Sequence, residues 1–225
     1  MKMQDVFCAL EETSEGVVEF IESEQYEWPH KWDKSVITYA VIEGTKDAGI
    51  FSKLRKAVGL SFRTWELRIP IKFKRVKKSQ NPDITIEFVN DPNQDEYFKD
   101  RKTVLAYAYY PKTRFQGVVR FNDYAYHWSD DGKNIKVKSD GITIHMRTYN
   151  VIHVLIHELG HSLGLSHDET NPGIDVMDPY YNGKITLSES DIYRIVKKYG
   201  NRIYSKWSMF SRRLRHLTYR KKNLV

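Results

Sequence analysis

Residues 157–168 have the sequence HELGHSLGLSHD, and this stretch decides which fold and chemistry the rest of the chain must support. It contains three histidines and one glutamate at fixed spacing: His157, Glu158, His161 and His167. Side chains four residues apart lie on the same face of an α-helix, so the first two imidazoles can reach one metal ion. Gly164 can adopt the left-handed conformation that ends a helix, and the turn then brings His167 to the same ion. Three nitrogen ligands with a fourth position left for water are typical of a catalytic zinc site, whereas structural zinc sites have four protein ligands.

The glutamate beside the first histidine completes an arrangement that activates water. Glu158 follows His157 directly and can reach a water on the metal, so we predict it as the general base. The alternative is a surface helix with incidental histidines. The extended spacing His-Glu-x-x-His-x-x-Gly-x-x-His is far rarer than its first five residues alone, which disfavours that alternative. Met177 follows in the sequence IDVMDP, as expected for the methionine turn that accompanies this motif.

Composition allows one domain with a sizeable core. The chain has 225 residues, of which 40% are hydrophobic and 13% aromatic. Cys8 is the only cysteine, which excludes an internal disulfide. Residues 1–24 lack the apolar core of a secretory signal, and no stretch has the length of a membrane span. The compartment is therefore unknown from the sequence.

The net charge of +7 is concentrated at the C-terminal end of the chain. Residues 202–225 hold eight of the 36 lysines and arginines and no acid, which leaves 28 basic and 29 acidic residues elsewhere. The apolar residues of this tail recur every three or four positions: Ile203, Trp207, Phe210, Leu214 and Leu217. We interpret it either as a helix that binds an anionic membrane or partner surface, or as a helix packed on the body. No nucleic-acid-binding motif accompanies the charge, so nucleic acid is not a predicted partner.

Hydrophobic periodicity places the strands and helices. Strands are predicted over residues 36–42, 71–76, 84–89, 104–110 and 118–121. Helices are predicted over residues 50–65, 150–163 and 188–199. Pro70 stops the first helix, and Ser188 with Asp191 forms a capping pair that opens the last. A small hairpin is expected about Asp140 and Gly141.

With these residues in place, the chain resembles the matrixins, the matrix-metalloproteinase branch of the metzincin zinc proteases. The resemblance covers residues 31–200. It begins with Lys-Trp-Asp-Lys at 31–34, which is similar to the entry of the family's catalytic domain. After Met177, Pro179 and Tyr181 match the last two elements of the family's Met-x-Pro-x-Tyr. Astacins and serralysins have a metal-binding tyrosine where this chain has Pro179, which argues against those branches.

The resemblance implies a zinc endopeptidase that hydrolyses peptide bonds of protein substrates. Its fold would be α+β, with a twisted, mixed five-stranded sheet, an active-site helix and a C-terminal helix. One catalytic zinc ion would be held by the three histidines, with Met177 beneath the metal. Pro179 and Tyr181 would line the substrate pocket. We expect the substrate to extend along the edge strand that contains Leu105 and Ala106. These two residues would also belong to the substrate pocket.

Several positions depart from the matrixin pattern. Matrixins carry a second, structural zinc bound by histidines, but the matching positions here are Tyr107 and Arg120, so we expect no structural zinc. Asn122 stands where the family commonly has an aspartate near calcium, and calcium binding is left open. Cys8 lies upstream of the domain, as an inhibitory prodomain cysteine would. The residues around Cys8 lack the motif that surrounds the inhibitory cysteine of matrixin prodomains. We therefore favour a thiol with no inhibitory role.

We therefore divide the chain into an N-terminal extension (1–30), a matrixin-like catalytic domain (31–201) and a basic amphipathic tail (202–225). We expect a monomer whose partner is a protein or peptide substrate. His153, one turn before His157, is predicted as a packed or hydrogen-bonded histidine rather than a fourth ligand. The alternative function is a non-catalytic binding protein that uses its tail on an anionic membrane or partner surface. It is disfavoured because every residue needed for the chemistry is present.

Overall fold

The computed structural model describes residues 30–47, 50, 52–101, 103–139 and 142–202, together with the backbone of residues 7–10. Strands form where apolar residues alternate, because one face of each is buried. In β4, Ile84, Ile86 and Phe88 are buried, whereas the intervening Thr85 and Glu87 are partly exposed. Five strands lie where the sequence predicts them: β2 (Val36–Glu43), β3 (Lys72–Arg75), β4 (Ile84–Val89), β5 (Val104–Ala108) and β6 (Val118–Asn122).

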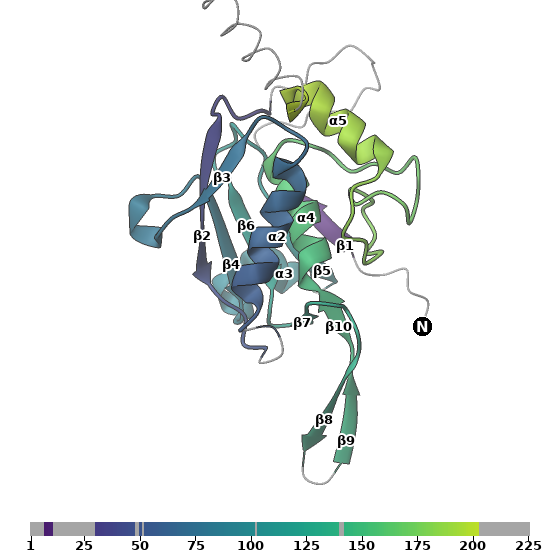
Figure 1. Ribbon diagram of the computed structural model, residues 1–225. Coiled ribbons are helices and arrows are strands. Elements are labelled where there is room, and N and C mark those ends of the chain that lie inside the picture. The colour runs from purple at the N-terminus through teal and green to yellow at the C-terminus, as the bar shows by residue number, and fades with distance from the viewer. Residues whose placement is uncertain are drawn as a thin grey trace, which may run out of the picture.

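The main sheet has the strand order β1-β5-β6-β4-β2-β3 among the described residues (Figure 1). Strands β2, β3, β4 and β6 are parallel, and β5 runs antiparallel to β6. The predicted α+β fold with a mixed sheet is confirmed. The sixth strand, β1 (Phe7–Leu10), comes from the predicted N-terminal extension and pairs in parallel with β5.

The pairing of β1 corrects one expectation. Strand β5 is not an edge strand in this structure, because Phe7 lies opposite Val104 and Leu10 lies opposite Ala108. The unpaired N–H and C=O groups of a sheet edge accept any extended segment of suitable pattern. Here a segment of the chain itself takes the edge that we expected to bind the substrate.

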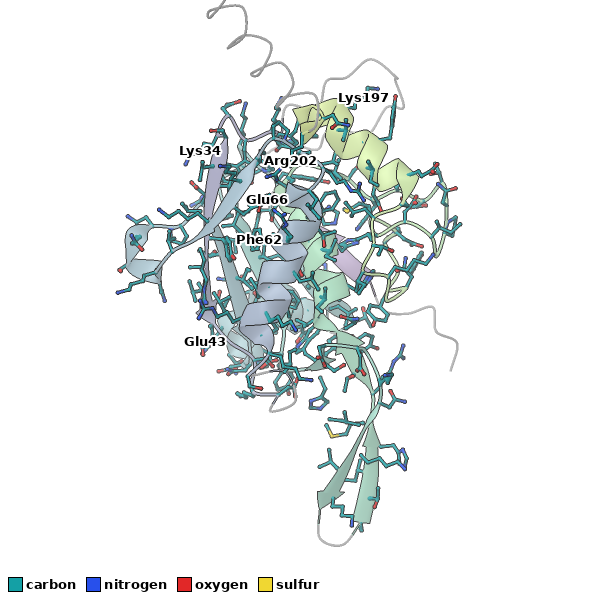
Figure 2. The ribbon with its side chains drawn as sticks, in the orientation of Figure 1. Lys34, Glu43, Phe62, Glu66, Lys197 and Arg202 are labelled. Carbon is teal, nitrogen blue, oxygen red and sulfur yellow. The ribbon has the colours of Figure 1, made fainter. Side chains whose placement is uncertain are left out.

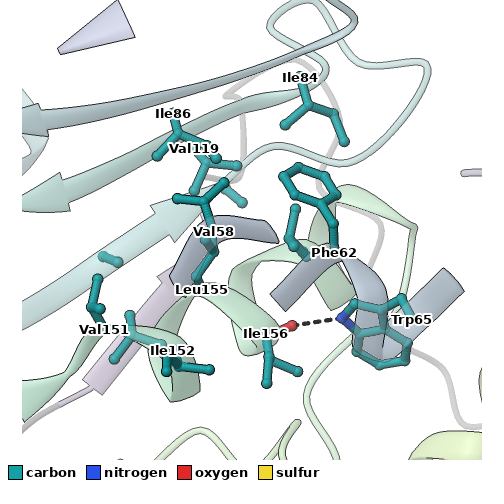
Figure 3. Packing of buried hydrophobic residues seen from close by; sticks show 14 of the residues in the cluster. Val58, Phe62, Trp65, Ile84, Ile86, Val119, Val151, Ile152, Leu155 and Ile156 are labelled. Carbon is teal, nitrogen blue, oxygen red and sulfur yellow. Dashed lines mark hydrogen bonds between the residues drawn. The ribbon is translucent and has the colours of Figure 1, made fainter. Parts of the chain in front are cut away.

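Helices α2 (Leu54–Glu66) and α4 (Val151–Ser162) pack against each other on one face of the sheet (Figure 1). The indole Nε1 of Trp65 donates a hydrogen bond of 2.9 Å to the carbonyl of Ile156 and fixes the two helices together (Figure 3). Val58 and Phe62 from α2 lie over Ile86 and the neighbouring strands, all buried. Burying a side chain of this size contributes roughly 1.5–3 kcal/mol.

Smaller helices and sheets complete the described part of the chain. Its other helices are α3 (Glu96–Asp100), α5 (Glu189–Tyr199) and two 3-10 turns, η1 (Lys78–Gln80) and η2 (Pro92–Gln94). Two small sheets pair β7 (His127–Ser129) with β10 (Thr148–Asn150), and β8 (Ile135–Ser139) with β9 (Ile142–Met146). The predicted hairpin about residues 140–141 is thus confirmed.

Helix α5 has the predicted cap. The Ser188 hydroxyl accepts a hydrogen bond from the Asp191 N–H, and the Asp191 carboxylate accepts one from the Ser188 N–H. Just beyond the helix, the Arg202 guanidinium donates to the carbonyl of Glu66 and attaches this end of the chain to α2 (Figure 2). Residues 203–225 of the predicted basic tail lie outside the described residues. In the part of the chain that is described, no helix has the length and apolarity needed to cross a membrane.

Candidate metal centre and active site

Helix α4 carries the first two histidines, and its ends are well defined. The Asn150 side chain caps it by accepting hydrogen bonds from the N–H groups of Ile152 and His153, at 2.9 and 3.3 Å. The helix stops at Gly164, whose φ of +89° lies in the left-handed region. A Cβ here would also lie 2.0 Å from the carbonyl oxygen of His30, so glycine is required at the turn. This turn sends the chain back toward α4 and places His167 beside it.

The three predicted histidines come together at their Nε2 atoms. The distances are 2.9 Å between His157 and His161, 3.2 Å between His161 and His167, and 3.3 Å between His157 and His167. A tetrahedral zinc ion with bonds of about 2.1 Å holds its nitrogen ligands roughly 3.4 Å apart. The donor set therefore fits zinc with little rearrangement. Among the described residues, this is the only group of three or more histidine, cysteine or acidic side chains with converging ligand atoms.

Hydrogen bonds on the far side of the rings orient these nitrogens. Nδ1 of His157 contacts the carbonyl of Val176 at 2.7 Å, and Nδ1 of His161 contacts the carbonyl of Leu165 at 2.7 Å. A carbonyl only accepts, so each Nδ1 donates its proton and each Nε2 keeps a lone pair for the metal. Burial lowers the pKa of His167 to about 4 and keeps the pKa values of His157 and His161 well below the ordinary value. The site therefore presents three neutral imidazoles at physiological pH.

The other predicted residues of the centre are buried beside it. Glu158 follows His157 on α4 and is fully buried. Met177 is also fully buried and packs on α4 so closely that a Cβ at Gly160 would meet its Sδ at 2.3 Å. The turn containing Met177 is held by Asp191, whose carboxylate accepts hydrogen bonds from the N–H groups of Val176 and Met177, at 2.9 and 3.3 Å. Sequence reasoning identified Asp191 only as a cap.

The residues predicted for the substrate pocket occupy two regions. Tyr181 lies next to α4, because its hydroxyl accepts a hydrogen bond of 2.9 Å from the Asn150 N–H. Pro179, two residues earlier, is buried. Leu105 and Ala106 are fully buried in β5, which packs against α4. Tyr181 and the two β5 residues thus belong to segments that contact α4 or its cap.

Two further aromatic contacts involve side chains near helix α4. The ring of Tyr110, just beyond β5, stands edge-on to His161 at 6.0 Å, a position that the strand pattern did not indicate. His153 is buried, its Nδ1 lies 2.5 Å from the Lys184 carbonyl, and its ring stands edge-on to Tyr181 at 5.0 Å. His153 does not belong to the converging histidine group, and it has the hydrogen-bonded role that we predicted.

A hydrogen-bonded network holds Tyr107 and Arg120, the two positions for which the family resemblance led us to expect no structural zinc. Tyr107 and Arg120 lie opposite each other on β5 and β6. The Tyr107 hydroxyl donates to Asp95 at 2.7 Å, and Arg120 donates to the same carboxylate at 3.0 Å and to Glu87 at 2.9 Å. Burial raises the pKa of Tyr107, so its hydroxyl keeps the proton that it donates. The Asn122 amide is bonded within the protein, to the Val104 carbonyl and the Ala125 N–H, both at 3.1 Å.

Comparison with known proteins agrees with this geometry. The family model described as Matrixin matches residues 31–200, a range that includes the three histidines, Glu158 and Met177. The chain belongs to the matrixin family. Matrixins are zinc metalloendopeptidases, and His157, His161 and His167 of this chain form a group that could hold such an ion.

Several curated matrixins are similar to the chain. Matrilysin of Homo sapiens is 30% identical over 195 residues, which cover 85% of this chain and 67% of matrilysin. Matrilysin of Felis catus is 33% identical over 181 residues, or 78% of this chain and 62% of the relative. Interstitial collagenase of Oryctolagus cuniculus is 30% identical over 171 residues, or 76% of this chain and 33% of the collagenase. The chain thus spans about a third of the collagenase and about two thirds of the matrilysins.

Proposed function

We propose that this matrixin is a zinc-dependent endopeptidase that hydrolyses peptide bonds of protein substrates, with one zinc ion per chain. The observation that carries the proposal is the convergence of three Nε2 lone pairs, two of them oriented by an Nδ1 donor to a backbone carbonyl. Bound zinc would lower the pKa of a coordinated water and polarise the scissile carbonyl.

Glu158 is the proposed general base. It follows His157 directly on α4 and is fully buried, so its carboxylate lies in a medium of low polarity. It takes a proton from the attacking water as the water oxygen bonds to the carbonyl carbon. It then delivers that proton to the amide nitrogen as the carbon–nitrogen bond breaks. The products are a carboxylic acid and an amine.

The substrate is proposed to extend along β5 and to place one side chain against Pro179 and Tyr181. Backbone pairing with a sheet edge tolerates many sequences, so selectivity would come from the contacts near Tyr181. Strand β1 pairs with that edge in the structure, so it would have to leave before the substrate binds. No structural zinc is proposed, because Tyr107 and Arg120 bind Asp95 and Glu87 instead.

The deciding experiment is cleavage of a quenched peptide library with matched metal analysis. We expect one zinc per chain, cleavage that is lost on chelation, and a fall in kcat of about 10²–10⁴ for Glu158→Gln with the zinc content unchanged. Glu169→Gln is the matched control, because Glu169 is exposed in the loop just after His167. A Glu158→Gln protein that cleaves as fast as the parent would refute the mechanism. A zinc-loaded protein that cleaves no library member would favour the non-catalytic binding function.

A further inference from the structure

The β8–β9 hairpin projects from the body of the molecule (Figure 1). Its two strands form a sheet of their own, with Ile135 opposite Met146 and Val137 opposite Ile144. A two-stranded ribbon on its own is at best marginally stable in water, because it cannot cover its own apolar face. A ribbon that extends into solvent with such a face is therefore suited to binding another chain.

The two faces of this ribbon differ in chemistry. Residues directly opposite each other share a face, so the register sorts the side chains. One face is apolar and carries Ile135, Val137, Ile142, Ile144 and Met146. The other carries Lys136, Lys138, Thr143 and His145. The apolar face is open to solvent, since Ile142 is 65% exposed and Ile144 47% exposed.

The base of the hairpin is joined to the candidate active site. The Thr148 hydroxyl contacts the Ser129 hydroxyl at 2.6 Å and donates to the Lys133 carbonyl at 2.8 Å. Two residues later, the Asn150 N–H donates to the Tyr181 hydroxyl, and the Asn150 side chain caps α4. The ribbon is thus continuous with the helix that carries the metal ligands and with the proposed pocket wall.

We propose that this ribbon binds an extended segment of the protein substrate in which apolar and acidic side chains alternate. The inference rests on the proposed endopeptidase function and names a substrate feature for it. No third strand pairs with β8 or β9 among the described residues, so the outer backbone edges can accept an extended chain. Added to the outer edge of β8, such a strand places alternate side chains on the two faces, so its apolar residues meet Ile135 and Val137 and its acidic residues meet Lys136 and Lys138.

Alternation of the two chemistries favours a strand over a membrane. A lipid surface would contact one face of the ribbon and leave the lysines on the opposite face, whereas an added strand uses both faces. An endopeptidase also needs an extended polypeptide at its catalytic centre, and β9 leads through β10 to Asn150, whose N–H donates to Tyr181.

The test uses three quenched peptides that share one cleavage sequence and differ in an appended extension. The extensions are a Val-Glu repeat, a Val-Lys repeat and a Gly-Ser repeat. A few cross-strand pairs at 0.2–1 kcal/mol each predict that the Val-Glu extension lowers KM by about 10-fold relative to Gly-Ser, with kcat unchanged. The Val-Lys extension should give no gain. In the K136E/K138E variant the ranking of the two repeats should reverse.

Matched variants test whether the KM ranking depends on residues of the ribbon or only on the net charge of the protein. K72E/K74E makes the same charge change at exposed, alternate positions of β3, another edge strand, and should leave the ranking unchanged. I135T/V137T should abolish the Val-Glu gain while cleavage of the Gly-Ser peptide continues. Equal KM values for the three peptides would overturn the inference and leave the proposed function standing, even if the protein bound anionic vesicles.

If no peptide is cleaved, the proposed function fails, and fluorescence anisotropy of the labelled peptides tests the ribbon directly. Equal binding of the Val-Glu and Val-Lys peptides would then overturn the inference.

Discussion

The carboxylate of Asp191 accepts a hydrogen bond of 2.9 Å from the backbone N–H of Val176, the residue whose carbonyl binds Nδ1 of His157. One buried carboxylate on α5 thus contacts, through the backbone of the single residue Val176, the ring of a proposed metal ligand on α4. The same carboxylate accepts a hydrogen bond from the N–H of Met177. We therefore infer that Asp191 positions the proposed metal centre as well as capping α5.

Asp191→Asn is expected to weaken zinc binding by about 10–100-fold, because loss of an outer partner lets the ligand ring reorient. The measurement is competition for zinc against a chelator of known affinity, with circular dichroism to show that the fold persists. Glu189→Gln is the control, because it removes an exposed acid from the first turn of the same helix. Equal zinc affinities for the two variants would show that Asp191 acts only as a cap.

Substitution by alanine is expected to have opposite effects on the stability of the fold at Gly160 and at Gly59. A Cβ at Gly160 would lie 2.3 Å from Sδ of Met177 and 3.1 Å from Trp65, so alanine has no room in this buried site. A Cβ at Gly59 on α2 would meet nothing within 4 Å. We expect Gly160→Ala to destabilise the fold by about 1–3 kcal/mol through overpacking. Gly59→Ala should stabilise it by up to about 1 kcal/mol through helix propensity. Urea unfolding of both variants checks the signs, and two changes of the same sign would contradict the packing around Met177.

The metal centre could be predicted from the sequence because its information is local. His157, His161 and Gly164 lie on one helix and its end, where spacing alone fixes the geometry. The cap of α5 is predictable for the same reason, since Ser188 acts on a residue three positions away. The β8–β9 hairpin followed from alternation about a turn.

The contacts that sequence reasoning missed are all long-range. Asp191 and Val176 are 15 residues apart, and His153 and Lys184 are 31 apart, so no periodicity joins them. Strand β1 was missed for the same reason. Its four residues form a strand because they pair with the edge of β5, and the N-terminal extension carries no residue pattern that predicts a strand.

Strand β1 leads to a prediction about activation. A chain that begins at His30 lacks β1 and leaves the outer edge of β5 free. We expect its kcat/KM on a short peptide to rise by about 10-fold or more, since the proposed path of the substrate uses the same backbone groups. Ala9→Pro in the full chain should act in the same direction, because proline cannot donate to the ladder. The measurement compares initial rates at equal zinc content. A truncated protein no faster than the full chain would show that β1 does not compete with the substrate.

The buried histidines make the stability of the metal-free protein depend on pH. Burial lowers the pKa of His153 to about 4, and it does the same for His167. In the unfolded chain both titrate near 6.5, so the unfolded state takes up protons first as the pH falls. The free energy of unfolding should therefore be at its full value above pH 6.5 and fall as the pH is lowered from there toward 4. Each such histidine contributes a slope of up to about 1.4 kcal/mol per pH unit.

Urea unfolding in chelator at pH 7, 6 and 5 gives this slope of the free energy of unfolding against pH. His153→Leu should reduce the slope by the contribution of about one proton. His145→Leu is the control at an exposed position on β9. A slope that His153→Leu leaves unchanged would mean that this ring is not buried in its neutral form.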